Sequence, residues 1–155
     1  MIPFIQLLHL AVLWFRNFIV PAEFFIYPYL TNKGLIPYSQ IIDHHFPGLF
    51  FLPVNFLSLG FTDAFSFKVL LLLIILIISV LLSRLAFIKS SNNLTSCLAV
   101  CFYSVWQLFF SGSVFWIDVL LPVFMLPGLI MFEKRKYFIS GLFFSLAVLF
   151  KQTAI

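Results

Sequence analysis

The chain has 155 residues, of which 63% are hydrophobic and only 9% are charged. A soluble domain typically carries about 25% charged residues. With a mean hydropathy of +1.16, the composition therefore excludes an ordinary soluble domain and predicts membrane lipids as partners. The net charge of +4 comes mainly from scattered basic residues, so we expect no nucleic-acid partner.

The apolar runs are of the length that membrane-spanning helices need, about 20 residues for a bilayer core roughly 30 Å thick. We therefore predict an all-α integral membrane protein with about five transmembrane helices in a single domain. The expected spans cover residues 3–20, 64–88, 94–110, 114–132 and 137–155. Pro122 and Pro127 lie inside the fourth span and predict a bent or broken helix there.

The basic residues indicate how the chain is oriented. Arg84, Lys89 and the compact turn 134–136 fall on one side, which the positive-inside tendency assigns to the cytoplasm. The N-terminus is then cytoplasmic, and residues 21–60 form an extracytoplasmic loop of a multi-pass protein in a prokaryotic plasma membrane. The fifth run ends without a closing loop, so we expect a fragment of a longer protein.

The loop at residues 21–60 gathers acids, histidines, tyrosines and prolines that lipid contact does not explain. An aromatic helix is expected from Glu23 to Lys33, lying in the membrane interface and ended by Gly34. A second interfacial helix is expected over residues 47–60, with its proline at the start. The two helices would bracket a polar turn at residues 43–45 and form a shelf for a lipid-linked substrate.

Four acids, Glu23, Asp43, Asp63 and Asp118, are expected on the extracytoplasmic side. Asp63 is interpreted as a helix-start residue. An aspartate within a membrane costs about 2.5–3.5 kcal/mol at the centre of a span. Asp118 lies near the start of the fourth span, where the helix dipole relieves part of that cost.

The order of short motifs in the loop carries a family resemblance. The sequence reads P-x-E, Y-P-Y-L, K-G-L-I-P-Y, D-H-H-x-P-G and L-S-L-G, followed later by G-x-x-x-x-L-A and K-x-T-A. This order resembles the N-terminal part of the GT-C membrane glycosyltransferases. The relatives it suggests are the protein O-mannosyltransferases, the lipid A aminoarabinose transferases and the RgtA-like bacterial enzymes.

The resemblance implies transfer of a sugar from a polyprenyl-phosphate-linked donor to an extracytoplasmic acceptor of unknown kind. It also implies that an acid in the first loop is the general base, often within an Asp-Glu pair. Here Ala22 stands where the aspartate is common, which leaves Glu23 as the catalytic acid of the loop. Asp118 matches the acidic residue that opens a later span and is the second catalytic candidate.

Elementary chemistry fits these assignments. A carboxylate takes the proton of an attacking hydroxyl, and carboxylates also stabilise the oxocarbenium-like charge that develops on the sugar. A cation such as Lys68 or Lys151 could neutralise the leaving phosphate. Candidates for binding sugar hydroxyls or the phosphate are Tyr38, Asp43, His44 and His45.

Several alternatives remain open from the residues alone. Glu23 could be a solvated helix-start residue, Lys151 could simply extend to the membrane surface, and the two histidines could be ordinary turn residues. We predict no cofactor and no metal site. A divalent metal at residues 43–45 is the alternative, because the ligand types suit it although adjacent residues rarely point at one ion.

The alternative function is a non-catalytic membrane subunit or transporter that binds lipid-linked sugars. Such a protein would place polar residues along its spans, where they line a path. The second and fifth apolar runs are nearly free of polar residues, and the polar groups gather at one face. The sequence therefore favours surface chemistry.

Overall fold

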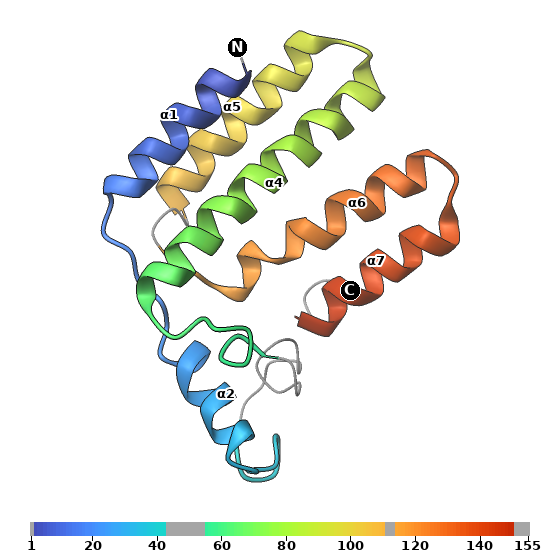
Figure 1. The fold of residues 1–155 in the computed structure, drawn as a ribbon. Helices are drawn as coiled ribbons and strands as arrows, with labels where there is room; N and C mark the ends of the chain where they lie inside the picture. The colour runs from blue at the N-terminus through green and yellow to red at the C-terminus, as the bar shows by residue number, and fades with distance from the viewer. Residues whose placement is uncertain (1, 43–54, 111–113, 151–155) are drawn as a thin grey trace.

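A computed structural model describes residues 2–42, 55–110 and 114–150 (Figure 1). The described residues contain helices joined by turns and loops, and no β-strand. This confirms the all-α prediction for the described part of the chain. The helices are α1 (Ile2–Phe15), α2 (Glu23–Asn32), α4 (Ala64–Ser90), α5 (Asn93–Phe110), the 3₁₀ turn η1 (Ile117–Val119), α6 (Leu121–Glu133) and α7 (Tyr137–Phe150).

The five apolar helices alternate in direction along the chain (Figure 1). At one end, Lys89 Nζ lies 2.6 Å from Glu133 Oε1 and joins the C-terminal ends of α4 and α6. At the opposite end, Lys68 Nζ donates to the Trp14 carbonyl at 2.6 Å, which joins the start of α4 to the end of α1. The basic turn at residues 134–136 therefore lies at one end, and α2 lies at the other.

Among the described residues, α4 alone is both long and apolar enough to cross a membrane, by length and composition. It has 27 residues, and Asp63 caps its start by accepting a hydrogen bond from the Ser66 backbone N–H at 2.9 Å. The interpretation of Asp63 as a helix-start residue is confirmed. The helices α1, α5, α6 and α7 are apolar but shorter.

The first predicted span ends earlier than expected. The helix stops at Phe15 rather than continuing to residue 20. The ammonium of Lys68 binds the carbonyls of Trp14 and Arg16, the acceptors that a longer helix would need. Instead the chain continues without helix, and the Ile19 carbonyl accepts a hydrogen bond from the Phe115 backbone N–H at 3.0 Å.

The fourth predicted span also needs correction, because its α-helix begins at Leu121 and not at residue 114. Pro122 occupies the first turn of α6, where its missing N–H is tolerated. A helix extended upstream would require that N–H to bind the Asp118 carbonyl. Asp118 therefore lies in η1, ahead of the helix and not inside it.

The predicted helix in the loop is confirmed as α2, and Gly34 ends it with a φ of +91°. The Gly34 N–H donates to the Thr31 carbonyl at 2.9 Å, and the Leu35 N–H donates to the Leu30 carbonyl at 3.1 Å. This pair of bonds is a common helix ending that needs a left-handed residue, which glycine adopts without strain.

The second predicted interfacial helix lies mostly outside the described residues. Its described end, residues 55–60, is a turn and not a helix. Asn55 and Ser58 hold this turn, because the Asn55 N–H donates to Ser58 Oγ at 2.8 Å and the Ser58 N–H donates to Asn55 Oδ1 at 3.1 Å. Such side chain–backbone bonds compete with helical hydrogen bonding.

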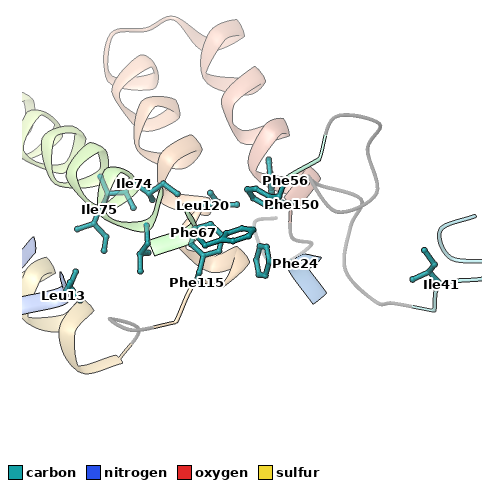
Figure 2. Close-up of a cluster of buried hydrophobic side chains, with 12 residues drawn as sticks. Leu13, Phe24, Ile41, Phe56, Phe67, Ile74, Ile75, Phe115, Leu120 and Phe150 are labelled. Atoms are coloured by element: carbon teal, nitrogen blue, oxygen red, sulfur yellow. The ribbon is translucent and has the colours of Figure 1, made fainter. Parts of the chain in front are cut away.

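Four buried phenylalanines pack together at the end of the molecule where α2 lies, and we call them the aromatic cluster: Phe24, Phe56, Phe67 and Phe115. Figure 2 shows these rings grouped beside Leu120 and Phe150. The centroid of the Phe115 ring lies 5.1 Å from that of Phe24 and 5.2 Å from that of Phe67. These edge-to-face contacts are the arrangement that aromatic rings prefer.

The outer surface of the helices is apolar. The side chains of Phe15, Phe109 and Phe138 are at least 80% exposed, and many leucines beside them are about half exposed. By contrast, several polar side chains are buried. Soluble monomers rarely show such extended apolar surfaces.

Candidate functional site

The aromatic cluster joins three segments that carry predicted site residues. Phe24 directly follows Glu23 at the start of α2, and Phe67 directly precedes Lys68 in α4. Phe115 lies three residues before Asp118, in the segment that leads into α6. The tertiary structure therefore brings the surroundings of Glu23, Lys68 and Asp118 to the same end of the molecule.

Glu23 is the first residue of α2 and is half-buried. Its carboxylate makes no hydrogen bond or ion pair with any residue that the structure describes. The preceding Ala22 has helical backbone angles and offers no side-chain cap. The side chain thus lies at the N-terminal end of α2, which is the positive end of the helix dipole.

Tyr38 lies in a turn after α2, with its side chain half exposed. Its φ of 62° is uncommon for a residue other than glycine. The turn is held by the Tyr38 N–H, which donates to the Ile41 carbonyl at 2.9 Å, and by Gln40 Oε1, which accepts from the Ile36 N–H at 2.8 Å. The predicted binding residues Asp43, His44, His45 and Lys151 lie outside the described residues.

Lys68 is placed where it stabilises a helix end. Its ammonium donates to the carbonyls of Trp14 and Arg16, at 2.6 and 3.3 Å, and lies 5.5 Å from the centroid of the Trp14 ring. A cation at the C-terminus of a helix interacts favourably with the helix dipole. The phosphate contact predicted for Lys68 stays a prediction, and the observed role is that of a cap for α1.

Asp118 lines a cavity of about 350 Å³ at the same end of the molecule. The cavity lies between α4, α5 and the segment that precedes α6. Its other lining residues are Ile78, Tyr103, Gln107, Val114, Trp116, Val119 and Pro122. A volume of about 300–1,000 Å³ is usual for a small-molecule site, so this cavity is large enough for a small ligand.

The sequence predictions did not include Gln107, which lines this cavity, or His9, which contacts Gln107. Gln107 is buried, and its Oε1 atom lies 2.8 Å from Nε2 of the buried His9, on α1. The His9 ring meets Tyr103 edge-to-face, with centroids 6.3 Å apart. The sequence does contain a signal for His9 and Gln107, because each is a polar residue within an apolar run. In a membrane protein, such a residue is a functional candidate.

His9 and Gln107 belong to a larger set of buried polar side chains on α1, α4 and α5, which we call the polar seam: Gln6, His9, Ser79, Ser96, Ser104 and Gln107. Several of their atoms have no hydrogen-bond partner among the described residues. These atoms are Gln6 Nε2, His9 Nδ1, Ser79 Oγ, Ser104 Oγ and Gln107 Nε2. Because a buried unpaired polar atom is costly, each one invites a ligand or water as partner.

Within the described ranges, no three His, Cys, Asp or Glu side chains lie close enough together to hold a metal ion. The Asp43-His44-His45 turn, which was the alternative metal site, lies outside those ranges.

Comparison with known proteins gives no match, either to a family model, to a curated protein or to a solved structure. The function is therefore inferred from the residues and their arrangement.

Proposed function

We propose that the chain is the N-terminal part of a GT-C type membrane glycosyltransferase, which moves a sugar from a polyprenyl-phosphate-linked donor to an extracytoplasmic acceptor. The observation that carries this proposal is the contact between Phe24 and Phe115, whose ring centroids lie 5.1 Å apart. The contact holds the start of α2 against the segment of Asp118. The two acids that the mechanism needs, Glu23 and Asp118, are thus kept at one end of the helices.

A multi-pass arrangement in a prokaryotic plasma membrane is part of the proposal. It is supported by the apolar outer surface and the buried polar seam, a distribution suited to a protein surrounded by lipid. The shorter helices fit a bilayer if flanking apolar residues or local thinning make up the length. The basic turn 134–136 lies at the end opposite α2, which supports a cytoplasmic N-terminus.

The contact between α6 and α7 gives further support for a lipid environment. Ser140 Oγ donates to the Gly128 carbonyl at 2.8 Å, and this bond is buried. A Cβ atom added at Gly128 would lie 3.2 Å from the Phe144 ring, so the two helices approach closely there. Small residues and interhelical hydrogen bonds of this kind hold helices together in membranes.

In the proposed reaction, the Glu23 carboxylate accepts the proton of an acceptor hydroxyl as its oxygen attacks the anomeric carbon. The bond from that carbon to the phosphate oxygen breaks, and the lipid phosphate leaves with the bonding electrons. Asp118 stabilises the positive charge that develops on the sugar ring. Lys68 or Lys151 neutralises the phosphate, while Tyr38 and the turn at residues 43–45 bind the substrates.

The test is a sugar-transfer assay with a labelled polyprenyl-phosphate hexose and membranes that contain the protein expressed from its complete reading frame. Glu23→Gln is expected to lower turnover by about 10²–10⁴-fold, because general base catalysis is lost. The matched control is Asp63→Asn, the same chemical change in an acid that caps α4, where asparagine caps equally well. Undiminished turnover in Glu23→Gln would remove this residue from the mechanism.

A second candidate function is a non-catalytic subunit or transporter for lipid-linked sugars, and the polar seam favours it. The seam runs along α1, α4 and α5, from a groove at the Gln6 and Ser96 end to the cavity at Gln107. Proteoliposomes with a fluorescent polyprenyl-phosphate sugar distinguish the two. Translocation that Ser79→Leu abolishes, without any transfer, would establish the second function in place of the first.

A further inference from the structure

The cavity beside Asp118 is lined by Gln107, whose amide nitrogen is buried and has no hydrogen-bond partner among the described residues. Nε2 of Gln107 lies in a side chain that is only 5% exposed, and Gln107 is one of the residues that line the cavity. The cavity is about tenfold larger than the space that one water molecule occupies in the liquid. An oxygen atom of a bound ligand is therefore a suitable partner for this donor.

His9 determines which atom of the Gln107 amide is left for a ligand. A carboxamide oxygen can only accept a hydrogen bond, so the 2.8 Å contact between Gln107 Oε1 and His9 Nε2 requires His9 to carry its proton on Nε2. This bond occupies the oxygen and leaves the amide N–H groups as the free side of Gln107. His9 itself does not line the cavity.

The remaining walls indicate the chemical class of ligand. The rings of Tyr103 and Trp116 and the apolar side chains beside them suit the flat face of a ring. The Asp118 carboxylate accepts hydrogen bonds from ligand hydroxyls and disfavours a second negative charge. A ligand with an apolar ring face, several hydroxyls and no negative charge satisfies all of these groups.

We propose that this cavity binds an uncharged polyhydroxylated ring, that Gln107 Nε2 donates to the oxygen of one of its hydroxyl groups, and that His9 positions Gln107 for this contact. The proposal rests on the proposed function only for the origin of the ring, which would be the sugar of the lipid-linked donor. Gln107 is then a specificity-determining residue and His9 a positioning residue, since His9 acts through Gln107.

The binding experiment uses the 155-residue chain in nanodiscs with Trp14→Phe and Trp106→Phe, so that Trp116 is the only tryptophan within these 155 residues. Its emission is recorded against free D-glucose, D-mannose and D-galactose, their monodeoxy analogues, and the farnesyl phosphate ester of each hexose. We expect a saturable change with at least one hexose. One monodeoxy analogue of that hexose should bind about tenfold more weakly, because it lacks the oxygen that Gln107 contacts.

The variants separate a specific contact from a structural role. Gln107→Met and His9→Leu are expected to abolish the tenfold difference in binding affinity between the hexose and its deoxy analogue. A merely structural role would instead weaken the binding of both ligands equally. His9→Gln should restore the ratio, because it places an N–H donor the same number of bonds from the backbone. Ser104→Ala, in the polar seam but outside the cavity lining, is the control and should keep the ratio.

Several outcomes would overturn the proposal. They are the absence of a saturable change with every free or lipid-linked hexose, a ratio of affinities unaffected by Gln107→Met in a folded variant, and tight binding of the uronate that corresponds to the bound hexose, equal to that of the hexose itself. Circular dichroism and gel filtration establish that each variant is folded. A response to the farnesyl phosphate ester but not to the free hexose would support the proposal and identify the lipid-linked sugar as the source.

Failure of this inference is distinguishable from failure of the proposed function. Hexose binding with the expected ratio, but without any sugar transfer, would support the cavity as a binding site and remove the enzymatic function. Transfer that depends on Glu23, with no response from Trp116 and no effect of Gln107→Met on the donor KM, would keep the enzyme and remove the cavity from it.

Discussion

The ring of Phe24 packs edge-to-face against the ring of Phe115, with centroids 5.1 Å apart and an interplanar angle of 75°. Phe24 comes from the helix in the long loop, and Phe115 from the segment that leads into α6. Both side chains are fully buried. This contact packs the start of α2 against the segment that carries Asp118, so the two acids lie at one end of the molecule.

Removal of the Phe24 ring should destabilise the fold strongly. Phe24→Ala is expected to lower the free energy of unfolding by about 3–5 kcal/mol, because the cavity left behind cannot be filled by its neighbours. Denaturant unfolding in detergent micelles measures the change. The control is Phe138→Ala, an 80% exposed position on α7 where the loss should be below about 1 kcal/mol. Equal losses at both positions would contradict a packed aromatic cluster.

The buried pair of His9 and Gln107 should show energetic coupling. His9→Leu leaves the Gln107 carbonyl oxygen buried and unpaired, at a cost of about 1–3 kcal/mol in unfolding free energy. The double variant His9→Leu/Gln107→Leu should lose less than the sum of the single variants, by about 0.5–3 kcal/mol. A cycle with Ser140→Ala, on α7, is the control. The effects of His9→Leu and Ser140→Ala on the free energy of unfolding are expected to add. If the effects of His9→Leu and Gln107→Leu also add, the interaction between His9 and Gln107 is refuted.

Lys68 should contribute to stability as a cap of α1, whatever its role toward a substrate. Lys68→Met is expected to lower the free energy of unfolding by about 1 kcal/mol, through loss of two carbonyl contacts and the contact with Trp14. Lys68→Arg keeps a cation and should retain most of this contribution to the free energy of unfolding. If Lys68 also binds the leaving phosphate, Lys68→Met raises the donor KM in the transfer assay; an unchanged KM restricts it to the structural role.

Close packing of α6 against α7 should make Gly128 sensitive to substitution. Gly128→Leu forces a side chain against the Phe144 ring, which a Cβ atom alone would approach to 3.2 Å, and should cost about 1–3 kcal/mol. Gly141→Leu, on α7, is the matched control, because a Cβ atom there meets nothing within 4 Å. Thermal unfolding of the two variants side by side gives the comparison, and similar midpoints would argue against close helix packing at Gly128.

Much of the architecture could be predicted from the sequence, because it depends on local patterns. The apolar runs predicted five helices in alternating directions, Asp63 predicted the start of α4, and Gly34 predicted the end of α2. These features follow from hydrophobicity, capping and backbone freedom within a few residues. The ends of α1 and α6 were predicted less well. Lys68, distant in sequence, binds the carbonyls at the end of α1, and Pro122 restricts α6 to a later start.

The candidate site was predicted only in part. The sequence predicted Glu23 and Asp118 on the same side of the membrane, but it did not show which segments pack between them. The cavity that Gln107 and Asp118 line is formed by three segments that meet only in the folded chain. The pair of His9 and Gln107 spans 98 residues, so no local pattern could have matched one with the other.

Composition and periodicity act residue by residue, so they are sufficient to predict a highly apolar, all-α chain with a polar, aromatic loop after its first helix. Which polar groups face one another depends on the tertiary contacts. The burial of Phe24, Phe67 and Phe115 in one cluster, and of His9 against Gln107, depends on helices that are distant in sequence but adjacent in space. Packing is a property of those contacts, and it determined where the candidate site lies.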